Sequence, residues 1–247
     1  KKYNISLGIS LLQYPLIKSF IAMLDLSLDI NKKNIATEKI IKVIQSPYIL
    51  AAIKERNNRE ILIYTILRKS KSYFKLNQLI TLMQDCPILE QIIKDIAKIK
   101  IANENTTENW LEIFYEYTNI FSFAIEKKLN SSEYQIFEKL QKEMLILNKT
   151  IILNNKININ KCVNILKQHL NNTIFQVKAG KANIHILGML EAEGLNFDAA
   201  WVGGLSSKTI PGYIKNYFFI NNHLAKKFNL PFSSFEIITK NAKNMLN

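Results

Sequence analysis

Apolar residues recur at helical spacing over most of this chain. The clearest stripe runs from Leu11 to Leu28, with Leu16 and Phe20 on one face, and it predicts a helix entered from a short extended piece at Ile5 to Leu7. The same periodicity predicts further helices over residues 38–45, 59–69, 76–84, 87–99, 108–129, 132–148, 159–170, 221–228 and 235–246. Residues 30 to about 172 therefore contain only predicted helices, joined by short polar turns.

Three local signals refine the helix boundaries. Thr37 is a suitable N-cap for the helix that begins at Glu38. Ser46-Pro47 predicts the start of another helix, because proline is tolerated in a first turn. Ser132 followed by Gln135 has the spacing of a capping box and predicts the start of the helix that runs to about Asn148.

The pattern changes after residue 172. Residues 183–187 and 199–202 are short apolar runs, and five of the seven glycines lie between Gly180 and Gly204. Two buried strands separated by glycine-rich turns are therefore predicted, which places the chain in the α/β class, although it is mostly helical. We expect a discontinuous core from residues 1–29 and 179–247, with an all-helical insertion over residues 30–178 that can rotate relative to this core.

Composition is that of a globular protein, with 48% hydrophobic and 21% charged residues among 247. No apolar stretch reaches the roughly 18 residues that a membrane-spanning helix needs. We therefore expect no membrane partner, and the two distant cysteines, Cys86 and Cys162, favour a reducing cytoplasm. Because the sequence begins at Lys1 and ends within a predicted helix, we expect it to be a piece of a longer polypeptide.

The net charge of +13 is concentrated near the C-terminus. Residues 1–148 carry 21 Lys and Arg against 16 Asp and Glu, whereas residues 149–247 carry 12 against 4. Such a cationic field suits a polyanion such as nucleic acid and acts mainly on phosphates. However, 30 of the 33 cations are lysines and asparagine is abundant, so a composition bias of an AT-rich genome would also explain the charge.

The segment LGMLEAEGLNFDAAWVGGL, residues 187–205, is the most informative part of the sequence. It resembles the segment that follows the helical insertion in superfamily 1 helicases, with Ala192, Gly194, Leu195 and Phe197 in matching places. It resembles more closely the AddB/RecB-like group of probable DNA repair proteins, whose pattern fits Leu190 to Leu205 throughout. Other segments resemble signposts of that group in the same order: residues 4–8, 46–48, 129–135, 175–176, 224–231, and Ser234 with Glu236.

This resemblance implies a bacterial protein whose second RecA-like helicase domain, with its helical insertion, corresponds to this chain. It also implies that the first RecA-like domain and the nuclease domain lie outside the chain. The helicase Thr, His, Lys and Glu fall on Gly188, Leu190, Glu193 and Asn196, so that Asn196 is a degenerate nucleotide-side position. At Thr209-Ile210-Pro211 the relatives tend to have a tryptophan before the proline, which Ile210 replaces.

The sequence contains no complete catalytic motif. It has no G-x-x-x-x-G-K-[ST] loop to hold a triphosphate, and Gly180-Lys181 lacks the upstream glycine. Glu126-Lys127-Lys128 matches only half of a nuclease motif and is interpreted as a solvated helix face, while Glu191 and Glu193 lack an accompanying nucleophile. The three histidines lack metal-ligand spacing. We therefore expect no catalytic residue, metal or cofactor in this chain.

Lysines interleave with aromatic residues in the C-terminal part. The candidate DNA-binding residues are Lys178, Lys181, Lys208, Lys215, Lys226 and Lys227. Lysines that hold phosphates and aromatics that stack on bases are what a single-strand groove needs, and Tyr213, Tyr217, Phe218 and Phe219 lie among these lysines. Alternatively these aromatics anchor an irregular loop on the core, and Trp201 is interpreted as a core residue of the second strand.

The hypothesis is a non-catalytic, helicase-like module of a DNA repair exonuclease. Its expected partners are DNA, as a single strand or a duplex end, other domains of the parent protein, and a helicase-nuclease partner subunit. One alternative is half of an active ATP-dependent DNA helicase motor. The other is a helical protein-interaction scaffold whose charge is incidental.

Overall fold

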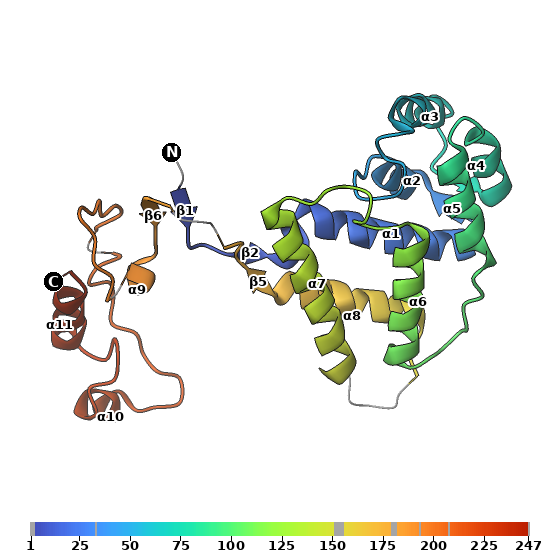
Figure 1. Ribbon diagram of the computed structural model, residues 1–247. Helices are drawn as coiled ribbons and strands as arrows, with labels where there is room; N and C mark the ends of the chain where they lie inside the picture. The colour runs from blue at the N-terminus through green and yellow to red at the C-terminus, as the bar shows by residue number, and fades with distance from the viewer. Residues whose placement is uncertain are drawn as a thin grey trace. The chain divides into compact units, whose positions relative to one another are not determined.

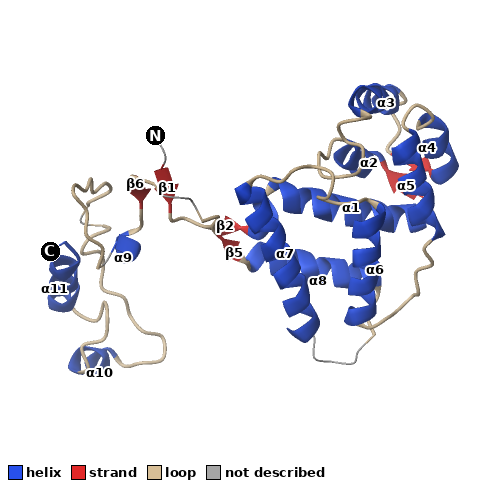
Figure 2. Ribbon diagram, viewed as in Figure 1, coloured by secondary structure: helices blue, strands red, loops and turns tan. Residues whose placement is uncertain are grey.

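The computed structural model describes residues 3–32, 34–150, 156–178, 182–192, 194–206 and 208–246. The chain is mostly helical with short strands, as Figure 2 shows, and belongs to the α/β class. It divides into two units. The helical unit is Gly8–Gly180, and the discontinuous unit combines Lys1–Leu7 with Lys181–Asn247. Within the described residues, no helix has the length and apolarity needed to cross a bilayer.

The helical unit contains eight α-helices among its described residues (Figure 1). They are α1 (Pro15–Asn31), α2 (Thr37–Ile44), α3 (Arg56–Arg68), α4 (Leu76–Leu82), α5 (Pro87–Lys98), α6 (Thr107–Ile120), α7 (Ser131–Thr150) and α8 (Ile159–Asn172). A 3-10 turn, η1 (Leu11–Gln13), precedes α1. Two antiparallel strand pairs complete the unit: β2 (Ile9–Ser10) with β5 (Ile174–Phe175), and β3 (Asn34–Ala36) with β4 (Tyr73–Lys75).

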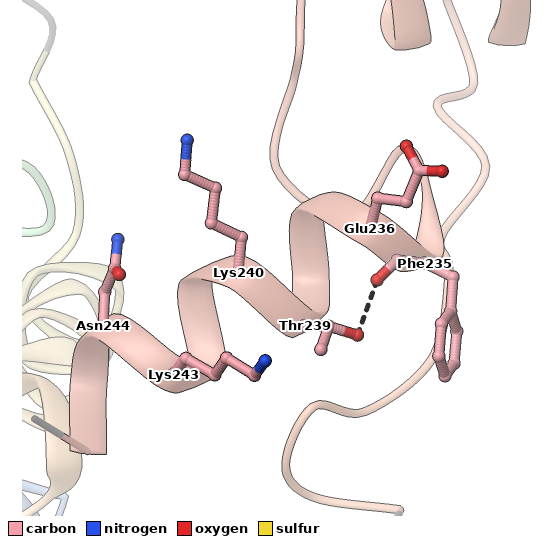
Figure 3. Close-up of a pocket in the computed structure, with 6 residues that line it drawn as sticks. All are labelled: Phe235, Glu236, Thr239, Lys240, Lys243 and Asn244. Carbon is pink, nitrogen blue, oxygen red and sulfur yellow. Dashed lines mark hydrogen bonds between the residues drawn. The ribbon is translucent and has the colours of Figure 1, made fainter.

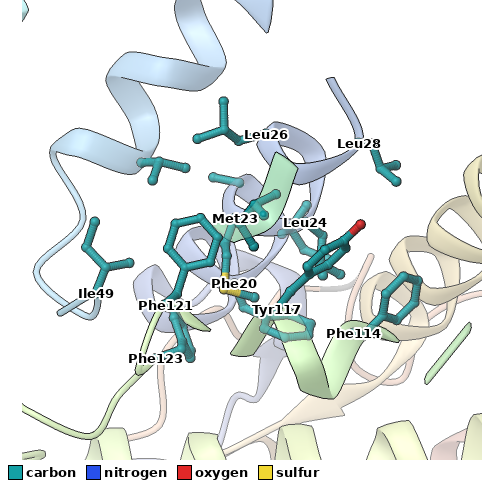
Figure 4. Close-up of a cluster of buried hydrophobic side chains, with 14 of the residues drawn as sticks. Phe20, Met23, Leu24, Leu26, Leu28, Ile49, Phe114, Tyr117, Phe121 and Phe123 are labelled. Atoms are coloured by element: carbon teal, nitrogen blue, oxygen red, sulfur yellow. The ribbon is translucent and has the colours of Figure 1, made fainter. Parts of the chain in front are cut away.

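α1 is the central helix of this unit. It is buried almost all round, since twelve of its residues from Leu16 to Ile30 are inaccessible, and it packs against α2, α5, α6 and α7. A helix that is apolar on every side needs neighbours on every side. Figure 4 shows α1 residues such as Phe20 and Met23 among aromatic side chains of α6 and the loop that follows it, including Tyr117 and Phe121.

This central position corrects the expected division of the chain. Residues 8–29 belong to the helical unit and not, as expected, to a core formed by residues 1–29 and 179–247. The hydrophobic core cluster consists of described residues between Leu11 and Leu170. The expected second boundary at residues 178–179 lies close to the observed one at residues 180–181.

The expectation that residues 30–178 contain only helices is wrong at three short strands. Ile35 of β3 and Phe74 of β4 are paired and buried, so this strand pair contributes to the core of the unit. Each of the two strands has only three residues, too few to show the alternation that identifies a strand in sequence. β5 also falls inside this range.

Several helix boundaries also differ from those predicted. The residues after Ser46-Pro47 form turns until Arg56, and the predicted helix over residues 108–129 ends at Ile120. Thr37 is the first residue of α2 and its hydroxyl donates to the carbonyl of Lys71, so it is not the N-cap.

The start of α7 has a different capping box from the one predicted. The Asn130 side chain accepts from the Glu133 N–H, and the Glu133 carboxylate accepts from the Asn130 N–H, both at 2.9 Å. This reciprocal pair satisfies two backbone donors at the helix start. The side chain of Gln135 instead bonds both the N–H and the carbonyl of Lys178, at 2.8 and 3.2 Å.

The discontinuous unit contains little buried surface. Its elements are β1 (Tyr3–Ile5), β6 (Ile184–Ile186), α9 (Met189–Ala192), α10 (Asn222–Lys227) and α11 (Phe235–Leu246). β1 and β6 pair in parallel, which confirms a strand within residues 183–187, but this strand is exposed and not buried as predicted. The second predicted strand, over residues 199–202, does not form, because this segment is exposed and no described residue pairs with it as a strand. Among the described residues, only Ala225, Ser233 and Ile238 of this unit are buried.

Candidate nucleic-acid interface

The six candidate lysines are distributed over both units. Lys178 lies near the end of the helical unit, where its backbone is held by Gln135 and its side chain is exposed. Lys208, Lys215, Lys226 and Lys227 are exposed in the discontinuous unit. Lys181 lies outside the described residues. The structure thus groups four of the candidates within one unit.

Lys208 lies within a hydrogen-bonded turn that Thr209 closes. The Thr209 hydroxyl donates to the Gly204 carbonyl at 2.7 Å and accepts from the Ser206 N–H at 3.0 Å. Gly204 has a φ of +74°, a conformation that a side chain would strain. The Ile210–Pro211 peptide that follows is cis.

Lys215 is placed by its backbone and by an aromatic ring. Its N–H donates to the Phe232 carbonyl at 3.0 Å, and its Nζ lies 4.9 Å from the centroid of the Phe232 ring. The cation therefore lies over the face of the ring, where the ring quadrupole attracts it.

Lys226 and Lys227 occupy the last turn of α10. Asn221 caps the start of this helix by accepting from the His223 N–H at 2.8 Å, and Ala225 is its buried residue. Cations in a last turn are favoured by the helix dipole, so both lysines stabilise the helix that presents them.

The described residues of this unit include six lysines and three carboxylates, those of Glu191, Asp198 and Glu236. Among its described residues no lysine forms an ion pair. Glu191 is occupied by hydrogen bonds from the Ser6 hydroxyl and from the Gly188 N–H, which hold the pKa of its carboxyl below the usual value. The lysine charges therefore remain available for an anion.

The aromatic side chains in this unit are more exposed than expected. Trp201 is 96% exposed, which corrects its interpretation as a core residue. Phe218 and Phe219 are each 99% exposed, with ring centroids 6.3 Å apart, so neither ring anchors the loop. Tyr217 does have an anchoring role, since its hydroxyl donates to the Pro231 carbonyl. Exposed rings among unpaired lysines are the combination that stacks on unpaired bases.

Asn196, which the resemblance predicts to be a degenerate nucleotide-side position, is exposed in the loop after Gly194. Gly194 has a φ of +78°, as a tight turn after α9 requires. Glu193, the second carboxylate of the Glu191–Glu193 pair, lies outside the described residues.

Two lysines that the sequence analysis did not single out lie on α11. Lys240 and Lys243 line a shallow surface pocket together with Phe235 and Thr239, whose hydroxyl donates to the Phe235 carbonyl at 2.8 Å (Figure 3). Every residue that lines this pocket comes from α11, so it does not bring together groups from different elements. The three-residue spacing of the two lysines on a predicted helix was the signal that could have identified them.

The two cysteine thiols and the Glu126–Lys127 segment lie in surroundings that indicate structural roles. Burial raises the pKa of the Cys86 thiol to about 11 and that of the Cys162 thiol to about 12, so both remain protonated near neutral pH. Glu126 and Lys127 lie in the loop after α6, not on a helix as predicted, and Glu126 accepts from the Ala51 N–H. Among the described residues, no three His, Cys, Asp or Glu side chains are grouped closely enough to hold a metal.

The sequence matches no family model, and neither a curated protein nor a solved structure is significantly similar to it.

Proposed function

We propose that this chain is a non-catalytic, helicase-like module of a DNA repair exonuclease, which contacts the DNA backbone and positions neighbouring domains. The order of the matching segments, from residues 4–8 to Glu236, supports this assignment by resemblance to the AddB/RecB-like group. In the proposal, the discontinuous unit is part of a RecA-like second helicase domain and the helical unit is its insertion.

The parallel pairing of β1 with β6 carries the proposal. Tyr3 pairs with Ile184 and Ser6 N–H donates to the Ile186 carbonyl at 2.9 Å, although the whole helical unit lies between them in sequence. Parallel strands require a crossover connection, and an insertion within a crossover gives this connectivity. A RecA-like domain interrupted by a helical insertion would have the same chain order.

The exposed apolar side chains of the discontinuous unit support a role in positioning neighbouring domains. Parallel strands are normally covered by helices on both faces, yet Ile184 and Ile186 of β6 are about half exposed. Large apolar side chains elsewhere in the unit, including Leu195 and Leu205, are also about half exposed. Such surface is stabilised when a neighbouring domain covers it.

DNA binding is supported by the lysines and aromatics of this unit. Unpaired lysines attract phosphates without reading sequence, because each acts as a point charge, whereas arginine forms the bidentate contacts that read bases. The affinity is therefore expected to be insensitive to sequence and steeply dependent on salt.

Two matched variants test this proposal. The unit variant carries K208Q, K215Q, K226Q and K227Q. The control variant carries K100Q, K128Q, K142Q and K161Q, four exposed lysines of the helical unit that form no ion pair with another described residue. Binding to a fluorescent 15-residue oligo(dT) is measured by anisotropy across a salt series.

Each lost phosphate contact on a single strand lowers the slope of log affinity against log salt by roughly 0.7, so we expect the unit variant to lose about 3 from the slope. The control variant should keep the wild-type slope. Equal losses in both variants would leave only non-specific attraction between a cationic protein and DNA, and the proposed interface would be wrong.

A further inference from the structure

The segment from α3 through β4 carries a second concentration of positive charge. All three arginines of the chain lie in α3. Arg59 is buried, where its guanidinium bonds Glu55 at 3.0 Å and the Leu50 carbonyl at 2.7 Å, so it serves packing. Arg56 forms an exposed ion pair with Glu60.

The remaining cations of this segment are uncompensated. Arg68, Lys69, Lys71 and Lys75 are exposed and form no ion pair with any described residue. No Asp or Glu occurs from Ile61 to Gln84. The two preceding carboxylates are already engaged, since Glu60 pairs with Arg56 and Glu55 pairs with Arg59. An anionic ligand that binds residues 68–75 would therefore contact four cations that have no ion-pair partner among the described residues.

Exposed apolar side chains lie beside these cations. Ile61, Tyr64 and Leu67 are 61, 65 and 56% exposed, on the side of α3 opposite to the buried Leu62 and Ile66. Tyr64 and Arg68 are four residues apart, which places them on the same face of the helix.

Tyr73 of β4 provides a second free ring beside these cations. It is 62% exposed, and its neighbour Phe74 is the buried residue of the strand. Neither Tyr64 nor Tyr73 has a ring contact among the described residues. Both rings are therefore available to a ligand.

We infer that the α3–β4 surface, defined as Tyr64, Arg68, Lys69, Lys71, Tyr73 and Lys75, binds single-stranded nucleic acid. The four cations hold consecutive phosphates, and the two tyrosine rings stack on unpaired bases, with Ile61 and Leu67 providing an apolar border. A paired duplex would offer its phosphates but not its base faces, so the two tyrosines favour the single strand. This site is formed by residues of the helical unit alone, and its proposal does not rest on the lysines of the discontinuous unit.

The test uses the full chain and the same oligo(dT) probe, with every protein carrying the four substitutions of the unit variant, so that the discontinuous unit does not mask binding by the α3–β4 surface. The α3 variant adds R68Q, K69Q, K71Q and K75Q, and the control adds the same number of substitutions at the control lysines. We expect the salt slope of the α3 variant to fall by about 3 relative to the unit variant, whereas the control keeps the slope of the unit variant. Tyr64→Ala should weaken oligo(dT) binding roughly tenfold through lost stacking, while Tyr64→Phe, which keeps the ring, should bind as the unit variant does.

Two results would overturn the inference. One is an α3 variant that binds no more weakly than the control variant, and this would leave the proposal for the discontinuous unit intact because the unit variant is measured separately. The other is displacement of oligo(dT) by poly-L-glutamate as efficiently as by unlabelled oligo(dT), together with normal binding by Tyr64→Ala. That pair of results would assign the surface to acidic protein segments. Circular dichroism melting of each variant identifies any loss that comes from unfolding.

Discussion

The Tyr48 hydroxyl donates a 2.8 Å hydrogen bond to Oε1 of Glu133, 85 positions further along the chain. The same carboxylate bonds the Lys127 ammonium, which also lies 4.5 Å from the centre of the Tyr48 ring. Two segments that the resemblance singled out separately, residues 46–48 and 129–135, thus meet in one contact. This contact joins the turns before α3 to the start of α7.

Tyr48→Phe should lower the free energy of unfolding by about 1–2 kcal/mol, because it removes one hydrogen bond to a charged group and leaves the ring in place. Urea denaturation at neutral pH measures this loss. Tyr134→Phe is the control, since Tyr134 is exposed and its hydroxyl forms no hydrogen bond with a described residue. Equal effects of the two substitutions would contradict a structural role for the Tyr48 hydroxyl.

The stability of the helical unit should fall in acid. Burial favours the neutral form of Glu133, but the hydrogen bonds from Lys127, the Asn130 N–H and Tyr48 outweigh it and hold the pKa below its usual value. Glu143, buried between Lys139 and His169, has a lowered pKa because hydrogen bonds from both partners likewise outweigh burial.

A lowered folded-state pKa stabilises the protein above the unfolded value of about 4.3, and this contribution disappears as pH falls through the folded pKa. The free energy of unfolding, measured between pH 7 and pH 3, should therefore decrease only at the acid end of this range. Glu133→Gln should be less stable than the wild type at pH 7 and should lose less on acidification. An unchanged pH profile in this variant would contradict the assignment.

Two i,i+4 ion pairs at the start of α3, one buried and one exposed, provide a matched comparison of burial. Arg59 and Glu55 are both at most 5% exposed, and Glu55 also accepts from the Ile88 N–H at 2.7 Å at the start of α5. Arg59→Ala should cost about 3–5 kcal/mol, because it leaves a buried carboxylate without its cation. Arg56→Ala removes an exposed pair of the same i,i+4 geometry and should change stability by less than about 1 kcal/mol. Similar losses of unfolding free energy in the two variants, measured by urea denaturation, would show that burial does not determine how much each ion pair contributes to stability.

The purified chain should hydrolyse neither ATP nor DNA, because the sequence has neither a phosphate-binding loop nor a complete nuclease motif. Phosphate release and the degradation of labelled DNA, each with magnesium and with manganese, measure these activities. Metal-dependent turnover that is abolished by a substitution in this chain would contradict the prediction.

Strong periodicity was enough to predict most of the helices. The apolar stripes of α5 and α8 have a single buried face, and their observed bounds lie within two residues of those predicted. The sequence also predicted α1 as a helix. It did not predict the central position of α1, because periodicity does not say which other elements bury a helix. The apolar residues on every side of α1 were the signal that it is the centre of the helical unit.

Predictions that a residue is buried were wrong in the discontinuous unit, where few of the described residues are buried. An apolar run at residues 199–202 has the composition of a strand, yet a strand needs a partner, and among the described residues none pairs with it. Trp201 is exposed for the same reason. The concentration of cations from Arg68 to Lys75 was missed because the charge was averaged over a segment that also contains the acidic helices of residues 87–138.

Photocrosslinking tests most directly the central claim that the discontinuous unit contacts DNA. A single-stranded oligonucleotide with 5-bromodeoxyuridine at every second position is bound to the full chain at low salt, irradiated and digested, and the crosslinked peptides are identified by mass spectrometry. We predict crosslinks at Trp201, Phe218 and Phe219, whose rings are almost fully exposed among unpaired lysines. These crosslinks should disappear in 0.5 M salt. Crosslinks confined to the helical unit, or a pattern that does not change with salt, would contradict the claim.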